Sequence, residues 1–348
     1  MKLRHSDYML WAKTQQRARY TLATSGVGAF PLGLLPVRME DLEINGDSTY
    51  GHPPLQQAIA QKCGVDPSSV VAAMGTSFAN HLAMAALIDA GDEVLMEQPV
   101  YELFLSTALY LGADVKRFER REENAWRIDP ADVRRILTPK TKLIVLTNLH
   151  NPSSVLTPEP VLREIGDLAK SVGARVLVDE VYLDAVFDET PRSAFHLGPE
   201  FVVTNSLTKV YGMSGLRCGW ILAEPDLARR MWRLNDLFAS IPAHPAERLS
   251  VIALNHLEIA RQRARDLLTV DRANLKALMD AEPRLAMVRT DWGTTAFVRL
   301  VEGDVEAYIS RLRNEFETSV APGHFFESDR GFRVGMGGAA GYFGVTPD

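Results

Sequence analysis

Short apolar runs alternate with stretches of helical period through the middle of the chain, and this alternation constrains the fold more than any other feature. Seven runs have the length and composition of buried strands: residues 70–74, 93–97, 115–118, 143–147, 175–179, 201–205 and 219–223. Helical stretches separate several of them, as at 77–89, 101–110 and 158–171. This order predicts an α/β fold with a mostly parallel central sheet covered by helices on both faces.

The 348 residues are too many for one small core. We expect an N-terminal segment over residues 1–44, a large domain over 45–242 and a small α+β domain over 243–348. In the last part, residues 246–279 are predicted to be helical, and strands at 286–289, 295–300 and 332–334 surround a helix at 305–317. The N-terminal segment is expected to pack with the small domain.

Composition excludes several classes of protein. The formal net charge of -6 gives neither a basic face for nucleic acid nor a polybasic membrane anchor. Cys63 and Cys218 are the only cysteines, which excludes a disulfide framework and argues against a cysteine-based metal site. No signal peptide or membrane-spanning run is visible, so we expect a cytoplasmic protein with no metal, nucleic-acid or membrane partner.

Ligands of open α/β sheets bind beyond the carboxyl ends of the strands, so the residues that follow the runs are the site candidates. Gly75, Thr76 and Ser77 follow the first run and open a helix, where free N–H groups and two hydroxyls can hold an anion. An ordinary helix N-cap is the alternative. Tyr101 follows the second run and either lies on a flat ring or is a rim tyrosine.

Polar residues also follow three later runs. Asn151 precedes a proline, and Asp179 ends its strand, where a buried carboxylate needs a cation such as a protonated pyridine nitrogen. Lys209 can form a Schiff base, and Arg217 has a fork that suits phosphate. Each residue alone has an ordinary explanation: Asn151 fits a turn, Asp179 fits an exposed loop, and Lys209 and Arg217 fit charges on the surface. Together with the preceding ones they supply every group that a pyridoxal-phosphate (PLP) site needs.

Four motifs resemble one known family. Ser206-Leu207-Thr208-Lys209, with residues 215–219 behind it, resembles the lysine motif of class I/II aminotransferases, which are PLP enzymes of fold type I. Asn151-Pro152 resembles the family's Asn-Pro motif, and Asp179-Glu180-Val181-Tyr182 resembles its Asp-Glu-x-Tyr motif. Thr49-Tyr50-Gly51 resembles a Tyr-Gly segment upstream. The resemblance is strongest between about Ser48 and Ala223 and thins toward both ends.

The resemblance implies the cofactor site in detail. Lys209 would carry PLP as a Schiff base and move protons, while Asp179 would keep the ring nitrogen protonated, which makes the ring an electron sink. Tyr182 and Asn151 would bind the ring hydroxyl oxygen, and Tyr101 would stack on the ring. Thr76, Ser77, Ser206 and Arg217 would hold the phosphate, and Gly75 and Thr208 are also predicted to bind the cofactor.

Substrate and partner contacts are implied in the same way. Arg333 matches the family's C-terminal arginine that binds the substrate α-carboxylate, and Asn151 is a further predicted substrate-binding residue. Tyr50 matches a tyrosine that reaches the phosphate of a neighbouring subunit, which implies a homodimer. Residues 24–28 resemble capreomycidine synthase, a cyclising relative, more than aspartate aminotransferase, and Gly26 there is a candidate for approach of the substrate carboxylate.

The predicted activity is transfer of the α-amino group of an amino acid to a 2-oxo acid, with Lys209, Asp179 and Tyr182 as the catalytic residues. One alternative is a PLP-dependent lyase or cyclase acting on an amino acid, because the cofactor residues are the same for these reactions. A more remote alternative is a non-catalytic, ligand-sensing regulator. The side chain of the substrate cannot be read from the sequence.

Overall fold

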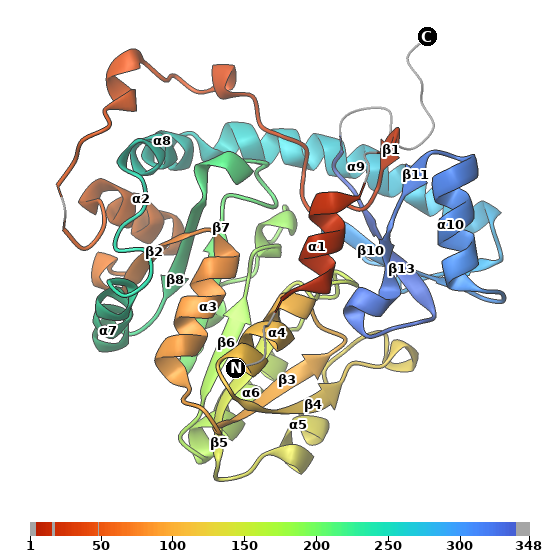
Figure 1. Ribbon diagram of the computed structural model, residues 1–348, viewed down its shortest axis with the longest axis horizontal. Helices are drawn as coiled ribbons and strands as arrows, with labels where there is room; N and C mark the ends of the chain where they lie inside the picture. Colours follow the sequence, from red (N-terminus) through yellow and green to blue (C-terminus); the bar gives the residue numbers. More distant parts are fainter. Residues whose placement is uncertain (1–4, 16–17, 48, 339–348) are drawn as a thin grey trace.

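The computed structural model describes residues 5–15, 18–47 and 49–338, which form a large β-sheet, a small β-sheet and a separate two-stranded pair, with helices packed around them (Figure 1). The large sheet has the order β2-β8-β7-β6-β5-β3-β4. Its strands are β2 (Val70–Met74), β3 (Glu93–Gln98), β4 (Asp114–Glu119), β5 (Thr141–Thr147), β6 (Arg175–Asp179), β7 (Phe201–Ser206) and β8 (Cys218–Leu222). All seven predicted strands are present, with bounds shifted by no more than a residue or two.

The large sheet is mostly parallel, as predicted. Only β8 runs against its neighbours, β2 and β7. In the parallel part the register places Thr147 of β5 opposite Asp179 of β6, and Asp179 opposite Thr204 of β7. The carboxyl ends of these three strands therefore meet at one edge of the sheet, where the polar residues of the sequence gather.

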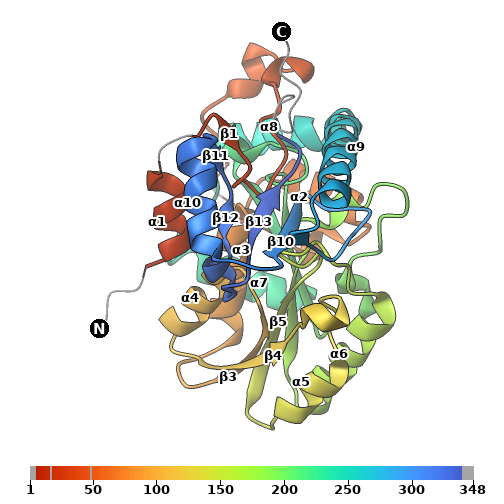
Figure 2. The same ribbon diagram turned by 90° about the vertical axis from the view of Figure 1, so that its right-hand side faces the viewer.

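Helices cover both faces of the large sheet, because each presents an apolar stripe to it. Helix α3 packs with α4 and α7 on one face, while α5 and α6 pack together on the other (Figure 2). In α6 the buried residues Leu162, Ile165 and Ala169 recur at helical spacing. The bounds are α2 (Pro53–Cys63), α3 (Thr76–Leu87), α4 (Glu102–Tyr110), α5 (Pro130–Ile136), α6 (Glu159–Ser171) and α7 (Pro225–Asn235).

The small sheet is antiparallel and has the order β12-β13-β10-β9. Its strands are β9 (Leu285–Ala286), β10 (Thr295–Leu300), β12 (Ala321–Pro322) and β13 (Gly331–Gly335). Three further helices are α8 (His244–Asn255), α9 (Leu257–Ala281) and α10 (Val305–Glu315). The single helical stretch predicted over 246–279 is thus two helices. The strand predicted at 286–289 is only the short edge strand β9, because it pairs with just the end of β10.

The N-terminal segment contacts both sheets. It begins with α1 (Asp7–Thr14), and β1 (Tyr20–Thr21) then pairs in parallel with β11 (Thr318–Ser319) beside the small sheet. A few residues later, the Val27 amide donates to the Lys209 carbonyl at 2.8 Å, at the edge of the large sheet. The domain bounds predicted from the sequence stay predictions. Within the described residues, no helix has both the length and the apolarity to span a bilayer.

Candidate active site

A cavity of about 800 Å³ lies at the carboxyl ends of the parallel strands, covered by the N-terminal segment. Most of the residues predicted for the cofactor and substrate line it, although they come from distant parts of the chain. Those that line it are Gly26, Thr76, Ser77, Tyr101, Asn151, Asp179, Tyr182, Thr208, Lys209 and Arg217. The fold therefore brings together what the strand-end rule selected from the sequence.

Asp179 ends β6 as a buried carboxylate. Its Oδ2 accepts a hydrogen bond from Asn80 Nδ2 at 2.9 Å, and its Oδ1 accepts from the Val181 amide at 2.9 Å. Burial raises the pKa of Asp179 to about 6, although these two hydrogen bonds and the charge of Lys209 oppose the rise. No described Lys, Arg or His forms an ion pair with this carboxylate, so it suits a cationic group brought in by a ligand.

Hydroxyl groups gather where α3 begins. Thr76 Oγ1 donates to Ser206 Oγ at 2.8 Å, and Ser206 Oγ also accepts from the Thr208 amide at 3.2 Å. Thr208 Oγ1 is buried and has no hydrogen-bond partner in the part of the chain that the structure describes. The first N–H groups of a helix are free of intrahelical bonds, so α3 adds further donors at this point.

Arg217 brings a positive charge to the same place. It has a left-handed backbone (φ +50°), and its Nη2 donates to the Met74 carbonyl at 3.1 Å. Gly75 makes room for it, because a Cβ at Gly75 would lie 2.3 Å from Arg217 Nη2. A guanidinium, a helix N-terminus and an unpartnered hydroxyl together suit a phosphate dianion.

Lys209 points toward the N-terminal segment. Its Nζ donates to Ser25 Oγ at 2.9 Å. Gly26 packs so closely that a Cβ there would lie 3.0 Å from the Lys209 carbonyl oxygen and 3.3 Å from its Cδ. The missing side chain of Gly26 therefore lets the backbone of residues 25–27 approach Lys209. The sequence had suggested that it lets a substrate carboxylate approach the backbone.

Arg333 is completely buried on β13, and no described Asp or Glu pairs with it. Its Nη1 donates to Asn151 Oδ1 at 3.1 Å, and its Nη2 donates to the Tyr8 hydroxyl at 2.9 Å and to the Ala23 carbonyl at 3.0 Å. Its Nε has no hydrogen-bond partner in the described chain. A buried guanidinium without a carboxylate is costly unless an anion completes it, so this side chain indicates an anionic ligand.

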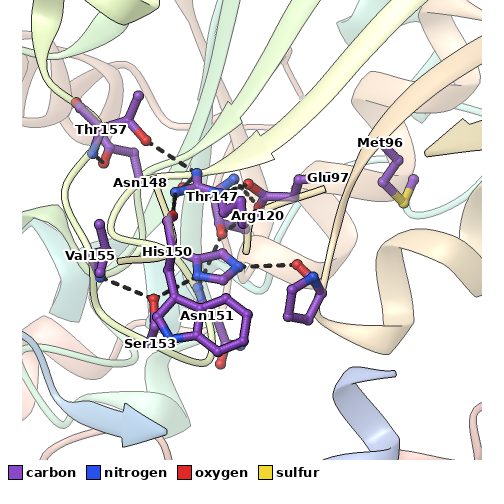
Figure 3. Close-up of polar contacts among 12 residues, drawn as sticks. Met96, Glu97, Arg120, Thr147, Asn148, His150, Asn151, Ser153, Val155 and Thr157 are labelled. Carbon is purple, nitrogen blue, oxygen red and sulfur yellow. Dashed lines mark hydrogen bonds and ion pairs between the residues drawn. The ribbon is translucent and has the colours of Figure 1, made fainter. Parts of the chain in front are cut away.

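A buried polar network holds Asn151 in place (Figure 3). The Asn151 amide donates to Thr147 Oγ1 at 3.1 Å, and Thr147 Oγ1 donates to Glu97 Oε1 at 2.7 Å. Arg120 Nε donates to the other oxygen of Glu97 at 2.6 Å, and both side chains of this ion pair are fully buried. The network therefore holds the loop that follows β5 in position.

His150 links that loop to the one before Tyr101. One ring nitrogen contacts Ser153 Oγ at 2.7 Å and the other contacts the Pro99 carbonyl at 3.0 Å (Figure 3). Burial, with the nearby charge of Arg120, holds the pKa of His150 well below its ordinary value. A neutral imidazole in this position is a structural bridge between two loops that line the cavity.

The other predicted residues lie behind or outside the cavity. Gly75 packs against the Arg217 guanidinium, and Ser206 accepts a hydrogen bond from Thr76. Arg333 is separated from the cavity by Asn151, to which it donates a hydrogen bond. Tyr50 does not line the cavity of its own chain; it is half exposed, and its hydroxyl donates to Asp236 at 3.2 Å.

Three residues of the site escaped the sequence reasoning. Asn80 lies one helical turn after Thr76 on α3, so the spacing of i and i+4 is a signal that could have identified it. Tyr8 lies on α1, and Ser25 lies in the stretch 24–28, where the sequence drew attention only to Gly26. Neither residue follows a predicted strand, so the strand-end rule could not select them.

Comparisons with known proteins agree with this geometry. A family model described as aminotransferase class I and II matches residues 43–341. Capreomycidine synthase of Streptomyces vinaceus is 29% identical over 92% of this chain and 86% of that protein. The arginine–pyruvate transaminase of Pseudomonas aeruginosa is 26% identical over 95% and 88%. A solved PLP-dependent aminotransferase from Streptococcus suis has a TM-score of 0.92 at 26% identity, over 99% and 95% of the two chains.

The chain belongs to the aminotransferase class I and II family, because the family model spans most of its length. Its fold is that of the PLP-dependent aminotransferases, and its cofactor is pyridoxal phosphate. The residues present fit this cofactor. Among the described residues, Asp179 is a buried acid with no ion-pair partner, Arg217 pairs with no acid, and Thr208 Oγ1 has no hydrogen-bond partner, while Lys209 lies in the same cavity.

Proposed function

We propose that this protein is an aminotransferase that moves the α-amino group of an amino acid to a 2-oxo acid. The observation that carries the proposal is the buried guanidinium of Arg333, with which no described acid pairs, beside a cavity that Lys209 and Asp179 line. Both substrates of such a reaction carry a carboxylate next to the reacting carbon. A fixed cation there would orient that carbon toward Lys209.

The roles proposed for the chain's residues follow from their places. Asp179 would hold the proton of the ring nitrogen, and Tyr182 and Asn151 would bind the ring hydroxyl oxygen. Thr76, Ser77, Thr208 and Arg217 would bind the phosphate, with Ser206 and Gly75 supporting them. Tyr101 would cover one face of the ring.

Lys209 Nζ would move the proton in the proposed reaction. When bound, PLP supplies an electron sink for the charge left at the substrate α-carbon. The lysine amine would take the proton from the substrate α-carbon and would give it up again within the same cavity. A positioned base of this kind contributes typically about 10²–10⁴-fold to the rate. Ser25 Oγ, at 2.9 Å, would orient the amine between these two positions.

A lyase or cyclase reaction is the second candidate. It is favoured by the likeness to capreomycidine synthase over 92% of the chain. All these reactions need the same α-proton removal, so Lys209 and Asp179 serve each of them. Only transamination leaves the amino group on the cofactor, and a half-reaction with a donor amino acid alone would distinguish them by the pyridoxamine absorption.

Assembly and location form part of the proposal. We infer a homodimer in which Tyr50 reaches the neighbouring subunit's phosphate site, since Tyr50 is half exposed and lies outside its own cavity. We also infer a reducing, cytoplasmic location, which the unpaired state of Cys63 and Cys218 supports.

Borohydride trapping tests the assignment of the lysine. Reduction of the holoenzyme should fix the cofactor covalently to the peptide that contains Lys209, as read by mass spectrometry. The variant Lys209→Ala should trap none and should show no exchange of the substrate α-proton. Trapping on another lysine in that variant would contradict the assignment.

A further inference from the structure

The loop that follows β5 turns at Ser154, whose backbone is left-handed (φ +60°). Residues other than glycine are disfavoured in this conformation, because their Cβ comes too close to the neighbouring backbone. Hydrogen bonds close the turn: the Ser154 amide donates to the His150 carbonyl at 2.6 Å, and the His150 amide donates to the Val155 carbonyl at 3.0 Å. A glycine would make this turn with less strain, so the serine side chain must have a reason of its own.

The buried side chain of Ser154 contacts the first residue of β10 in the small sheet. Its Oγ donates to the Thr295 carbonyl at 2.7 Å and lies 3.1 Å from Thr295 Oγ1. Thr295 Oγ1 in turn donates to the Pro152 carbonyl at 3.2 Å. These contacts join a loop of the large sheet to a strand of the small sheet that lies 141 positions later in the chain.

Gly293 supplies the space for this contact. It also has a positive φ (+95°), and a Cβ there would lie 2.2 Å from Ser154 Oγ and 2.4 Å from Ser154 Cβ. Arg272 Nη2, from α9, donates to the Gly293 carbonyl at 3.1 Å and helps to hold this backbone in place. The two positions are therefore complementary: Ser154 has a side chain where glycine would be less strained, and Gly293 has none where a side chain would collide.

The same loop meets the small sheet at a second point. Asn151 Oδ1 accepts from Arg333 Nη1 at 3.1 Å, and Arg333 lies on β13, the strand that pairs with β10. In that pairing Thr295 is opposite Gly335, and Phe297 is opposite Arg333. Contacts at two points on neighbouring strands fix the orientation of the small sheet relative to the loop, whereas a contact at Asn151 alone would fix only a distance.

We propose that Ser154 is a positioning residue that holds the small sheet, and with it Arg333, in a fixed place relative to Asn151 and the cofactor. This inference rests on the proposed function, because it presumes that Arg333 binds the substrate carboxylate and that Asn151 binds the cofactor. Ser154, Gly293 and Thr295 do not line the cavity, so Ser154 acts on the substrate only through its neighbours. The hydrogen bonds of its hydroxyl offset the strain of the left-handed backbone.

Two ligands of the apoprotein separate binding of the substrate part from binding of the cofactor part. N-(5′-phosphopyridoxyl)-L-alanine carries the ring and phosphate of the cofactor together with an amino-acid carboxylate, whereas pyridoxamine 5′-phosphate lacks the amino-acid part. The ratio of their dissociation constants, measured by fluorescence titration, therefore reports how well the protein holds the amino-acid part. Neither compound reacts with the apoprotein, so the measurement needs no turnover.

The variants Ser154→Ala and Ser154→Gly both remove the hydroxyl. In each we expect binding of phosphopyridoxyl-alanine to weaken about tenfold, because Arg333 is displaced, while binding of pyridoxamine 5′-phosphate stays the same. Stability should distinguish the two variants, because glycine relieves the left-handed strain and alanine retains it. Ser154→Gly should therefore unfold at a higher urea concentration than Ser154→Ala. An equal loss of affinity in variants of unequal stability distinguishes positioning from a general weakening of the fold.

Ser250→Ala is the matched control. Ser250 is also buried, and its Oγ donates to a main-chain carbonyl, that of Ala246, at 2.6 Å, but it lies on α8 outside the cavity. This variant should leave the ratio unchanged. An unchanged ratio in the two Ser154 variants overturns the proposal, and so does a ratio that follows their stability. Equal affinity of the unaltered apoprotein for the two ligands would show instead that Arg333 binds no carboxylate, which overturns the proposed function and this inference with it.

Discussion

Gly75 illustrates how a single residue determines the geometry of the phosphate end. Its φ of +80° and the missing side chain let Arg217 Nη2 reach the Met74 carbonyl. Gly219 packs against the same spot, since a Cβ there would lie 2.5 Å from the Gly75 carbonyl carbon. The two glycines therefore let the end of β2 and the start of β8 pack closely beside the predicted anion site.

The variant Gly75→Ala should displace Arg217 and weaken binding of PLP about ten- to a hundredfold, because a charge-assisted hydrogen bond is lost. Fluorescence titration of the apoprotein with PLP measures this. Gly173→Ala is the control, because Gly173 also has a positive φ (+73°) but nothing lies within 4 Å of its Cβ. Both glycines have a positive φ, so equal cofactor affinity in the two variants would show that the contact with Arg217 is unimportant.

At the scale of elements, α1 is a short helix whose position depends on its first residues. Ser6 caps it by accepting from the Met9 amide at 3.0 Å, and the same hydroxyl binds Glu102 of α4. An eight-residue helix is marginal by itself, so tertiary contacts must hold α1 over the cavity.

Replacing Ser6 with Ala should therefore cost about 1 kcal/mol of local stability. We expect faster amide hydrogen exchange in α1, measured by mass spectrometry of the peptide that contains it. Asp304→Ala is the matched control, since Asp304 caps α10 by accepting from the amides of Glu306 and Ala307. That variant should loosen α10 alone. Unchanged exchange in α1 of the Ser6 variant would mean that the cap does not hold the helix.

At the scale of the whole molecule, the large sheet buries acids whose protonation depends on folding. Glu180 follows Asp179 and accepts from the Ala194 amide at 2.7 Å. Burial raises the pKa of Glu180 from 4.5 to about 7. Between these values the folded chain binds more protons than the unfolded chain, so this group favours folding below pH 4.5, and its contribution is lost as the pH rises through about 7.

The apoprotein should therefore lose up to about 3 kcal/mol of stability between about pH 5 and about pH 8 because of Glu180. The variant Glu180→Gln should lose less over this range, as measured by urea unfolding at each pH. Glu315→Gln, at an exposed residue of α10, should behave like the unaltered protein. A pH dependence that is the same in Glu180→Gln would contradict the assignment of the buried proton.

The sequence by itself determined the large sheet and the residues at its strand ends. Apolar runs and helical periods are local properties, so β2 to β8 could be predicted within a residue or two. The strand-end rule then selected Asp179, Lys209 and Asn151, which line one cavity. The α/β fold, the family and the cofactor were predicted correctly, while the amino donor and acceptor were not readable.

Only the tertiary structure decided the strand order, in which β8 is inserted antiparallel between β2 and β7, and the cover over the cavity. Tyr8 meets Arg333 across 325 positions of sequence, and Ser25 meets Lys209 across 184. No periodic pattern links residues so far apart. Their meeting depends on how the two sheets and α1 pack, and packing depends on the shapes of all the surfaces together and not on any local run of sequence.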